Sequence, residues 1–244
     1  MALFDLLIVL AMLGAAFLYS SVGHGGASAY LAILALAGIA PAQMRPAALI
    51  MNVVVAGLAL VHFHRKGWFR WSLFWPFAVT AVPLAFLGGK ISLPTQTYKI
   101  MVGIVLAFAA LRLFWAPGQT SHTDGRPLNR WIALGAGSGI GLLSGLTGVG
   151  GGIFLSPLLV LLRWAAVKVA AAVSAAFVLA NSLSGLLALS GNLTLPAHLW
   201  WWLGAVVIGG WTGSWLGSSR FHSPVLLRLL GVVLLVAAGK LMFF

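Results

Sequence analysis

The chain is dominated by apolar stretches long enough to cross a lipid bilayer, and this feature most restricts what it can fold into. A helix of about 20 residues spans the roughly 30 Å hydrocarbon core of a membrane. Of the 244 residues, 61% are hydrophobic and 7% are charged, whereas soluble domains carry about 25% charged residues. A single soluble core could not bury that much apolar surface. We therefore expect an all-α, polytopic membrane protein.

Apolar segments follow one another along the chain, and two of them are shorter than the rest. The segments are 3–22, 27–40, 46–63, 71–89, 98–116, 131–147, 152–163, 168–190, 197–218 and 223–243. The short ones, 27–40 and 152–163, each follow a cluster of glycines. Residues 2–22 contain Asp5 and lack a basic start, so we expect a retained membrane helix there rather than a signal peptide.

The two halves of the sequence resemble each other. Gly148 follows Gly23 by 125 positions, and each of them opens a glycine cluster. The longest polar stretch, 117–130, lies between the halves and has the composition of a surface linker. The expected organisation is a first membrane repeat over 1–116, this surface linker over 117–130 and a second membrane repeat over 131–244.

The basic residues predict how the segments are oriented. With five membrane-entering segments per repeat, ten Lys and Arg residues fall on one face and four on the other. With four segments per repeat, seven fall on each face. The positive-inside rule favours the uneven distribution and makes the basic face cytoplasmic, with both termini outside. An odd number of segments means that the repeats are inverted relative to each other, as in many secondary transporters.

The glycine clusters GHGGASAY (23–30) and GVGGGIFLSP (148–157) interrupt the helical pattern at matching places. Irregular backbone at membrane depth is tolerated only inside protein or along a wet cavity. Glycine permits positive φ angles, and the helix after each cluster presents unpaired N–H groups, which bind anions. In inverted repeats two such helix ends can meet near the bilayer midplane. Close helix packing through small residues is the alternative interpretation.

Backbone N–H groups and short polar side chains at these breaks are the expected anion ligands. The candidate substrate-binding residues are Ser21, Gly23, His24, Gly25, Gly26, Asn52, Thr147, Gly148, Gly150, Gly151, Gly152, Asn181 and Ser184. Asn52 and Asn181 are 129 positions apart, so we expect equivalent places in the two repeats; interhelical hydrogen bonding is their alternative role. His24 is the candidate for proton coupling, because it is the titratable side chain expected at membrane depth. A neutral histidine bonded to a carbonyl is the alternative.

The residues that are missing exclude several classes of protein. Asp5 and Asp124 are the only acidic residues, and neither is expected within the membrane core, where cation transporters usually place carboxylates. The chain has no cysteine and no Walker motif, and it lacks the acids of hydrolytic triads and zinc sites. We therefore expect no enzymatic activity, no cofactor and no metal.

The expected partners are a small anionic substrate and membrane lipids. The net charge of +12 is expected to meet anionic headgroups rather than nucleic acid. An anion permease fits these observations. The alternative is a non-transporting membrane protein that assists assembly or binds a partner.

The segment GVGGGIFLSPLL (148–159) resembles the glycine-rich signature of the sulfite exporter TauE/SafE family of bacterial membrane transporters. The chain length and the two-copy layout are similar to that family as well. The segment GHGGASAYLAIL (23–34) departs from the signature, with Ala27 in place of the third glycine and no counterpart of Pro157. The resemblance implies transport of sulfite, or of an organosulfonate such as sulfoacetate, across the inner membrane with coupling to protons. It places both expected termini in the periplasm.

Overall fold

The computed structural model describes residues 3–114, 126–191, 193–219 and 224–243, and across these ranges the fold is all-helical, as predicted. The helices are α1 (Leu3–Ser21), α2 (Ala27–Leu36), α3 (Pro41–Arg65), α4 (Trp71–Lys90), α5 (Thr95–Phe114), α6 (Arg130–Thr147), α7 (Gly152–Leu161), α8 (Val167–Leu189), α9 (Leu199–Ser219) and α10 (Pro224–Phe243). Most of the predicted linker 117–130, including Asp124, lies outside the described residues.

The helix boundaries follow the predicted segments closely, with one instructive difference at α3. This helix begins at Pro41 rather than near residue 46, because the fixed φ of proline suits the first helical position. Pro46 then lies inside the helix and cannot donate a hydrogen bond to the carbonyl of Ala42. The hydroxyl of Thr194 donates to that carbonyl instead, at 3.2 Å. A tertiary contact therefore satisfies the group that proline leaves unpaired.

Several helices have the dimensions of membrane spans. By length and apolar composition, four described segments qualify: Phe4–Ser21, Pro41–Arg65, Trp71–Lys90 and Val167–Leu189. Large apolar side chains also cover the outside of the bundle; for example, Trp200 is 78% exposed and Leu187 is 67% exposed. These features support a multi-pass membrane protein in which lipid solvates the outer surface.

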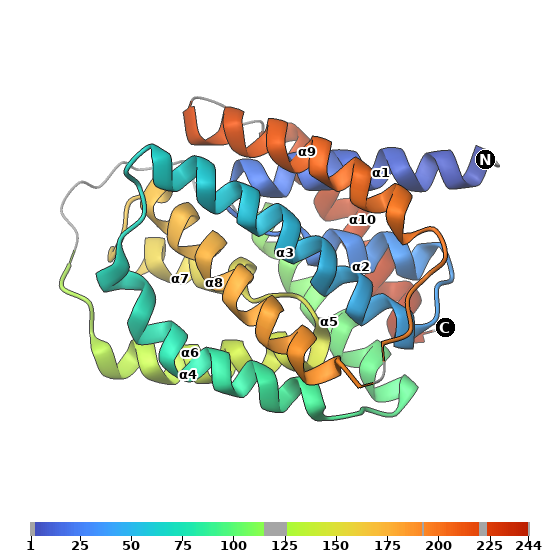
Figure 1. Ribbon diagram of the computed structural model, residues 1–244, viewed down its shortest axis with the longest axis horizontal. Coiled ribbons are helices and arrows are strands. Elements are labelled where there is room, and N and C mark those ends of the chain that lie inside the picture. The colour runs from blue at the N-terminus through green and yellow to red at the C-terminus, as the bar shows by residue number, and fades with distance from the viewer. Residues whose placement is uncertain (1–2, 115–125, 192, 220–223, 244) are drawn as a thin grey trace.

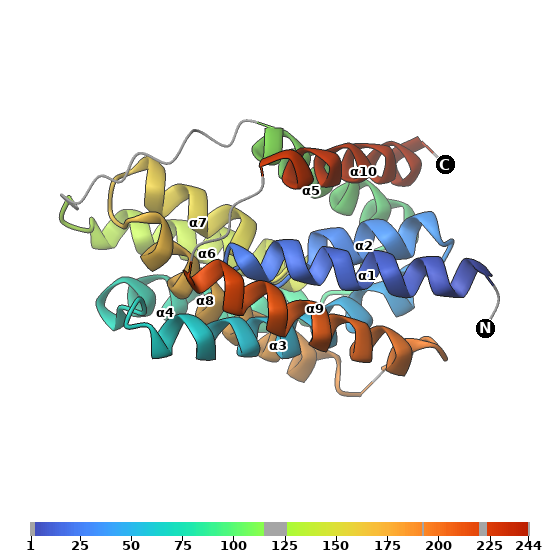
Figure 2. The same cartoon turned by 90° about the horizontal axis from the view of Figure 1, so that it is seen from above.

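Two pairs of long helices lie side by side at opposite edges of the bundle, α1 with α9 and α4 with α6 (Figures 1 and 2). Both pairs are held by glycines spaced four residues apart. On α6, Gly137, Gly141 and Gly145 lie against backbone carbonyls of α4. On α9, the corresponding glycines 209, 213 and 217 lie against carbonyls of α1. Small residues at this spacing let two helix backbones approach closely without a side chain between them.

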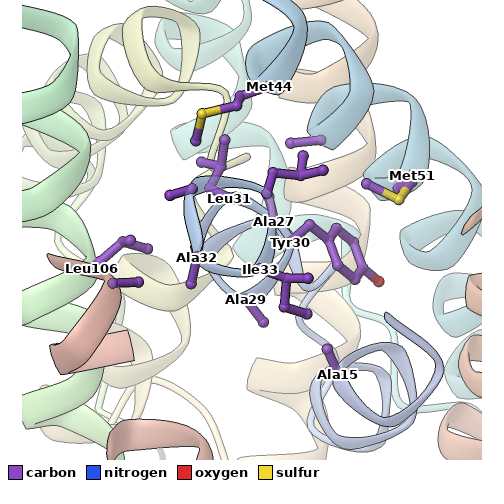
Figure 3. Packing of buried hydrophobic residues seen from close by; sticks show 14 of the residues in the cluster. Ala15, Ala27, Ala29, Tyr30, Leu31, Ala32, Ile33, Met44, Met51 and Leu106 are labelled. Carbon is purple, nitrogen blue, oxygen red and sulfur yellow. The ribbon is translucent and has the colours of Figure 1, made fainter. Parts of the chain in front are cut away.

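The centre of the bundle is formed by α3 and α8, which pack against each other and run in opposite directions (Figure 1). The helices α5 and α10 form a further pair, and α10 packs on α2. Figure 3 shows side chains leaving α2 on all sides, with Met51 of α3, Leu106 of α5 and Ala15 of α1 around it. Every residue of α2 except Leu36 is buried. The first break therefore leads into a helix enclosed by protein rather than by lipid.

Both chain termini lie at the same end of the bundle, on the right in Figures 1 and 2. From the N-terminus, α1 runs into the bundle and α2 returns toward the same end (Figure 2).

The glycine contacts between α4 and α6 predict a position-specific effect on stability. In Gly141→Ala, the new Cβ would overlap the backbone of Ala81, and overpacking of this kind costs about 1–3 kcal/mol. The matched control is Gly139→Ala on the same helix, where a Cβ would meet nothing within 4 Å. Thermal unfolding of the purified protein in detergent should show a lowered Tm for Gly141→Ala alone. Equal Tm values for the two variants would contradict this packing.

Candidate functional site

The two glycine clusters form matching breaks in the helical backbone. Each break begins with a glycine in the left-handed region that ends the preceding helix: Gly23 (φ 74°) after α1 and Gly148 (φ 83°) after α6. Each ends with another such glycine directly before the next helix: Gly26 (φ 100°) before α2 and Gly151 (φ 84°) before α7. A residue with a Cβ would be strained at these angles, which explains why glycine occupies them.

The breaks leave peptide N–H groups without helical partners. At the start of α7, the N–H groups of Gly152 and Ile153 have no acceptor among the described residues. At the start of α2, the N–H groups of Ser28 and Ala29 are likewise unpaired within the described chain. Unpaired N–H groups and the positive end of the helix dipole make such positions suitable for anions.

Asn52 connects the two breaks through its carboxamide group. Its Oδ1 accepts a hydrogen bond from the backbone N–H of Ala27, at 3.0 Å, and so caps α2. Its Nδ2 donates to the carbonyl of Val149 in the other break and to Ser182 Oγ, each at 3.3 Å. Asn52 is fully buried on α3, so one side chain of the central helix pair bonds to both breaks.

Asn181 has different surroundings, although the sequence pairs it with Asn52. It is fully buried on α8, but within the described part of the chain neither its Oδ1 nor its Nδ2 has a hydrogen-bond partner. Val178, one helical turn earlier, lies opposite Asn52 instead. Gly25 and Gly150 are each in contact with both side chains, so a Cβ on either glycine would overlap Asn52 and Val178. The predicted equivalence of the asparagines therefore does not describe the packing. Asn52 on α3 faces Val178 and Ser182 on α8 rather than Asn181.

A small cavity lies between the breaks. Its lining residues are Tyr19, His24, Gly25, Gly26, Ala27, Ser28, Val149, Gly152, Ile153 and Val178. The volume of about 10 Å³ is room for one water molecule. The predicted site residues His24, Gly25, Gly26 and Gly152 thus come together from two distant parts of the chain, and the cavity is too small in this conformation for a larger solute.

The side chain of His24 faces this cavity in a defined orientation. Its Nδ1 lies 2.9 Å from the carbonyl oxygen of Val22, which favours the tautomer with the proton on Nδ1 and leaves Nε2 as the basic nitrogen. The ring lies edge-on to Tyr19, 6.1 Å between centroids. The Tyr19 hydroxyl accepts a hydrogen bond from Ser28 Oγ at 2.8 Å. Neither Tyr19 nor Ser28 is among the predicted site residues; their positions on either side of the first break were the available signal.

Other predicted residues lie behind the cavity rather than along it. The hydroxyls of Ser21, Thr147 and Ser184 bond to the carbonyls of Leu18 (2.7 Å), Leu143 (2.7 Å) and Val82 (2.6 Å) respectively. The last of these joins α8 to α4. Gly150 packs on the Asn52 side chain and Gly151 on Ile140 and Phe177. In this conformation these residues shape the breaks and do not line the cavity.

The chain is similar to known membrane transporters over almost its whole length. A family model described as "Sulfite exporter TauE/SafE" matches residues 7–241. The protein named "Probable membrane transporter protein y4hK" from Sinorhizobium fredii is 34% identical over 229 residues, which cover 92% of this chain and 93% of that protein. No solved structure matches the chain.

The contrast between the two asparagines gives a testable difference in stability. Asn52→Leu should lower the free energy of unfolding by about 1–3 kcal/mol, because buried partners of its carboxamide lose their hydrogen bonds. Asn181→Leu should be neutral or stabilising, because it removes buried polar atoms that have no partners. Thermal unfolding followed by tryptophan fluorescence measures both. A larger decrease in the free energy of unfolding for Asn181→Leu than for Asn52→Leu would contradict the role of Asn52 in joining the breaks.

Proposed function

The chain belongs to the sulfite exporter TauE/SafE family of membrane transporters, and from this premise we propose that it is a secondary transporter for a small oxyanion. The substrate we propose is sulfite or an organosulfonate such as sulfoacetate, moved by alternating access. We also propose that it lies in the bacterial inner membrane with both termini in the periplasm. The fold alone would not choose the substrate, so the proposal depends on the chemistry of the breaks.

The observation that carries the proposal is the convergence of both breaks on one buried cavity. Residues 24–28 line it from one half of the chain, and residues 149, 152 and 153 from the other. Unpaired N–H groups of α2 and α7 lie at these breaks. Preorganised N–H donors in a water-excluded place bind anions strongly. No acidic side chain lines the cavity, so nothing in its lining repels a negative charge.

The arrangement of the helices supports inverted repeats and alternating access. The central helices α3 and α8 run in opposite directions (Figure 1). The first helix of each half packs against a helix of the other half. In the first half α1 packs against α9, and in the second half α6 packs against α4. Each repeat is thus held by glycine contacts to the other. In transporters of this plan, rocking of one group of helices against the other exposes a central site to each face in turn.

A flux measurement tests the transport function directly. Purified protein in liposomes should carry sulfite, sulfoacetate, sulfate or thiosulfate with saturable kinetics. In Gly152→Ala, the new methyl group would enter the cavity lining against Val178 Cγ2. We expect it to lower saturable flux about tenfold, the equivalent of ~1.4 kcal/mol. Gly57→Ala on α3 is the control, since a Cβ there would meet nothing within 4 Å.

Two results would contradict the transport proposal. One is the absence of saturable flux for all four anions in the unmodified protein. The other is unchanged flux in a folded Gly152→Ala protein.

Proton coupling through His24 makes a separate prediction. In the unmodified protein, an imposed pH gradient should accelerate anion flux if His24, which lines the cavity, carries the coupled proton on the ring nitrogen that does not bond to Val22. The variant His24→Gln keeps polar atoms at the position but cannot carry the proton. We expect it to retain anion flux while losing the response to the gradient. A gradient response of normal size in His24→Gln would assign coupling to another group.

A further inference from the structure

A second, larger cavity lies at the end of the bundle where α4 and α8 end and α3 begins. It has a volume of about 490 Å³, and its lining includes Arg45, Lys90, Ser92, Tyr98 and Thr194. We call this cavity the vestibule. Arg45 and Lys90 are its basic residues, and no acidic residue lines it. The vestibule is therefore positively charged and polar, in contrast to the apolar outer surface of the bundle.

Arg45 is buried at the inner end of the vestibule. Its Nη2 donates hydrogen bonds to the carbonyls of Gly88 (2.9 Å) and Gly89 (2.8 Å) in the last turn of α4. The same nitrogen donates to the carbonyl of Gly145 in the last turn of α6. Nη1 makes only a long bond of 3.4 Å to the carbonyl of Ile91. Two helix ends with partial negative charge thus hold one guanidinium group.

Among the described residues, no side chain neutralises the charge of Arg45. All of its hydrogen-bond partners are backbone carbonyls, and its Nε is buried without a partner. The side chain is only 8% exposed. A buried cation normally pairs with a carboxylate, since desolvation of a charge is costly. Here an unpaired N–H donor and a net positive charge remain beside the vestibule.

The floor of the vestibule is in contact with the second break. A Cβ on Gly148 would lie 3.1 Å from Arg45 Cγ. The hydroxyl of Tyr98 donates to the carbonyl of Thr147, the last residue of α6, at 3.2 Å. At the first break the corresponding glycine, Gly23, packs against Ala171 of α8 instead. The two breaks therefore differ in a further respect: the second has the Arg45 side chain beside it.

We propose that the vestibule is an anion-binding site that precedes the central cavity, and that Arg45 binds a sulfonate- or sulfite-type oxyanion there. This inference rests on the proposed transport function and names where the anion enters. The ligand would accept a hydrogen bond from Nη1, whose present bond to Ile91 is long, with Lys90 in the lining adding a second positive charge. Charge-assisted hydrogen bonds to an oxyanion are stronger than bonds to neutral carbonyls. Binding therefore weakens the hydrogen bonds from Arg45 to the carbonyls at the ends of α4 and α6, next to the second break.

The test uses the absence of cysteine from the chain. The variant Ser92→Cys places a single thiol in the vestibule lining, and a neutral, membrane-impermeant maleimide reports its accessibility. Sulfoacetate, added to the purified protein in detergent, should slow labelling in a saturable manner; chloride at equal ionic strength should not. When Arg45→Gln is combined with Ser92→Cys, the sulfoacetate concentration that gives half protection should rise at least about tenfold, because one charge-assisted contact is lost. Arg45→Lys, which keeps the charge, should raise it less.

Two further variants separate anion binding from a purely structural role. Lys168 also caps a helix end, because its Nζ donates to the carbonyls of Gly217 (2.7 Å) and Ser219 (3.0 Å). Lys168→Gln should lower the Tm and leave sulfoacetate protection unchanged. If Arg45→Gln does not fold, Lys90→Gln in the vestibule should still weaken protection about two- to threefold, as expected for a partly exposed charge.

The outcomes distinguish this proposal from the transport proposal. No sulfoacetate protection, or equal protection in the Arg45→Gln, Lys168→Gln and unmodified backgrounds, would overturn the vestibule site even if the protein transports anions. Protection in detergent that disappears in vesicles containing phosphatidylglycerol would assign the vestibule to a lipid headgroup and would also overturn it. Protection without flux would leave the vestibule site standing while refuting transport.

Discussion

An unpaired peptide group in lipid costs several kcal/mol, and the rest of the structure depends on keeping the two backbone breaks away from lipid. The first break leads into α2, which is buried on almost every side. Both breaks lie against the central pair of α3 and α8. The long outer helices can enclose them only because glycines on α6 and α9 allow close packing. The same enclosure that satisfies the membrane constraint leaves a small cavity between the breaks, lined by residues at the starts of α2 and α7.

The Asn52 carboxamide is the interaction that organises this place. It supplies an acceptor to the start of α2 and a donor to a carbonyl of the other break. Replacement of a lost helical bond by a side chain is common at helix N-termini, but here the side chain comes from another helix and joins both halves of the chain. The opposite position is Val178. The breaks are alike in backbone conformation and unlike in the side chains that face them.

A second difference in side chains separates the two breaks. Arg45 lies beside the second break and Ala171 beside the first. In a transporter built from inverted repeats, such a difference would give the site unequal affinity for an anion from the two faces. The sidedness of transport would then come from a few side chains on α3 and α8 rather than from the backbone conformation of the breaks, which is similar.

The sequence by itself determined the helical class, the order of the segments and the two breaks, because these depend on local properties: apolar length, proline and glycine positions, and charge in the loops. It also identified His24 and Gly152, which line the cavity. Only the tertiary structure decided that Asn52 faces Val178 rather than matching Asn181. It also decided that the hydroxyls of Ser21, Thr147 and Ser184 bond to backbone carbonyls. The cavity-lining positions of Tyr19, Ser28 and Arg45 were likewise visible only in the fold. Those facts depend on the rotation and register of packed helices, which are set by contacts between residues far apart in the chain and leave no local pattern in it.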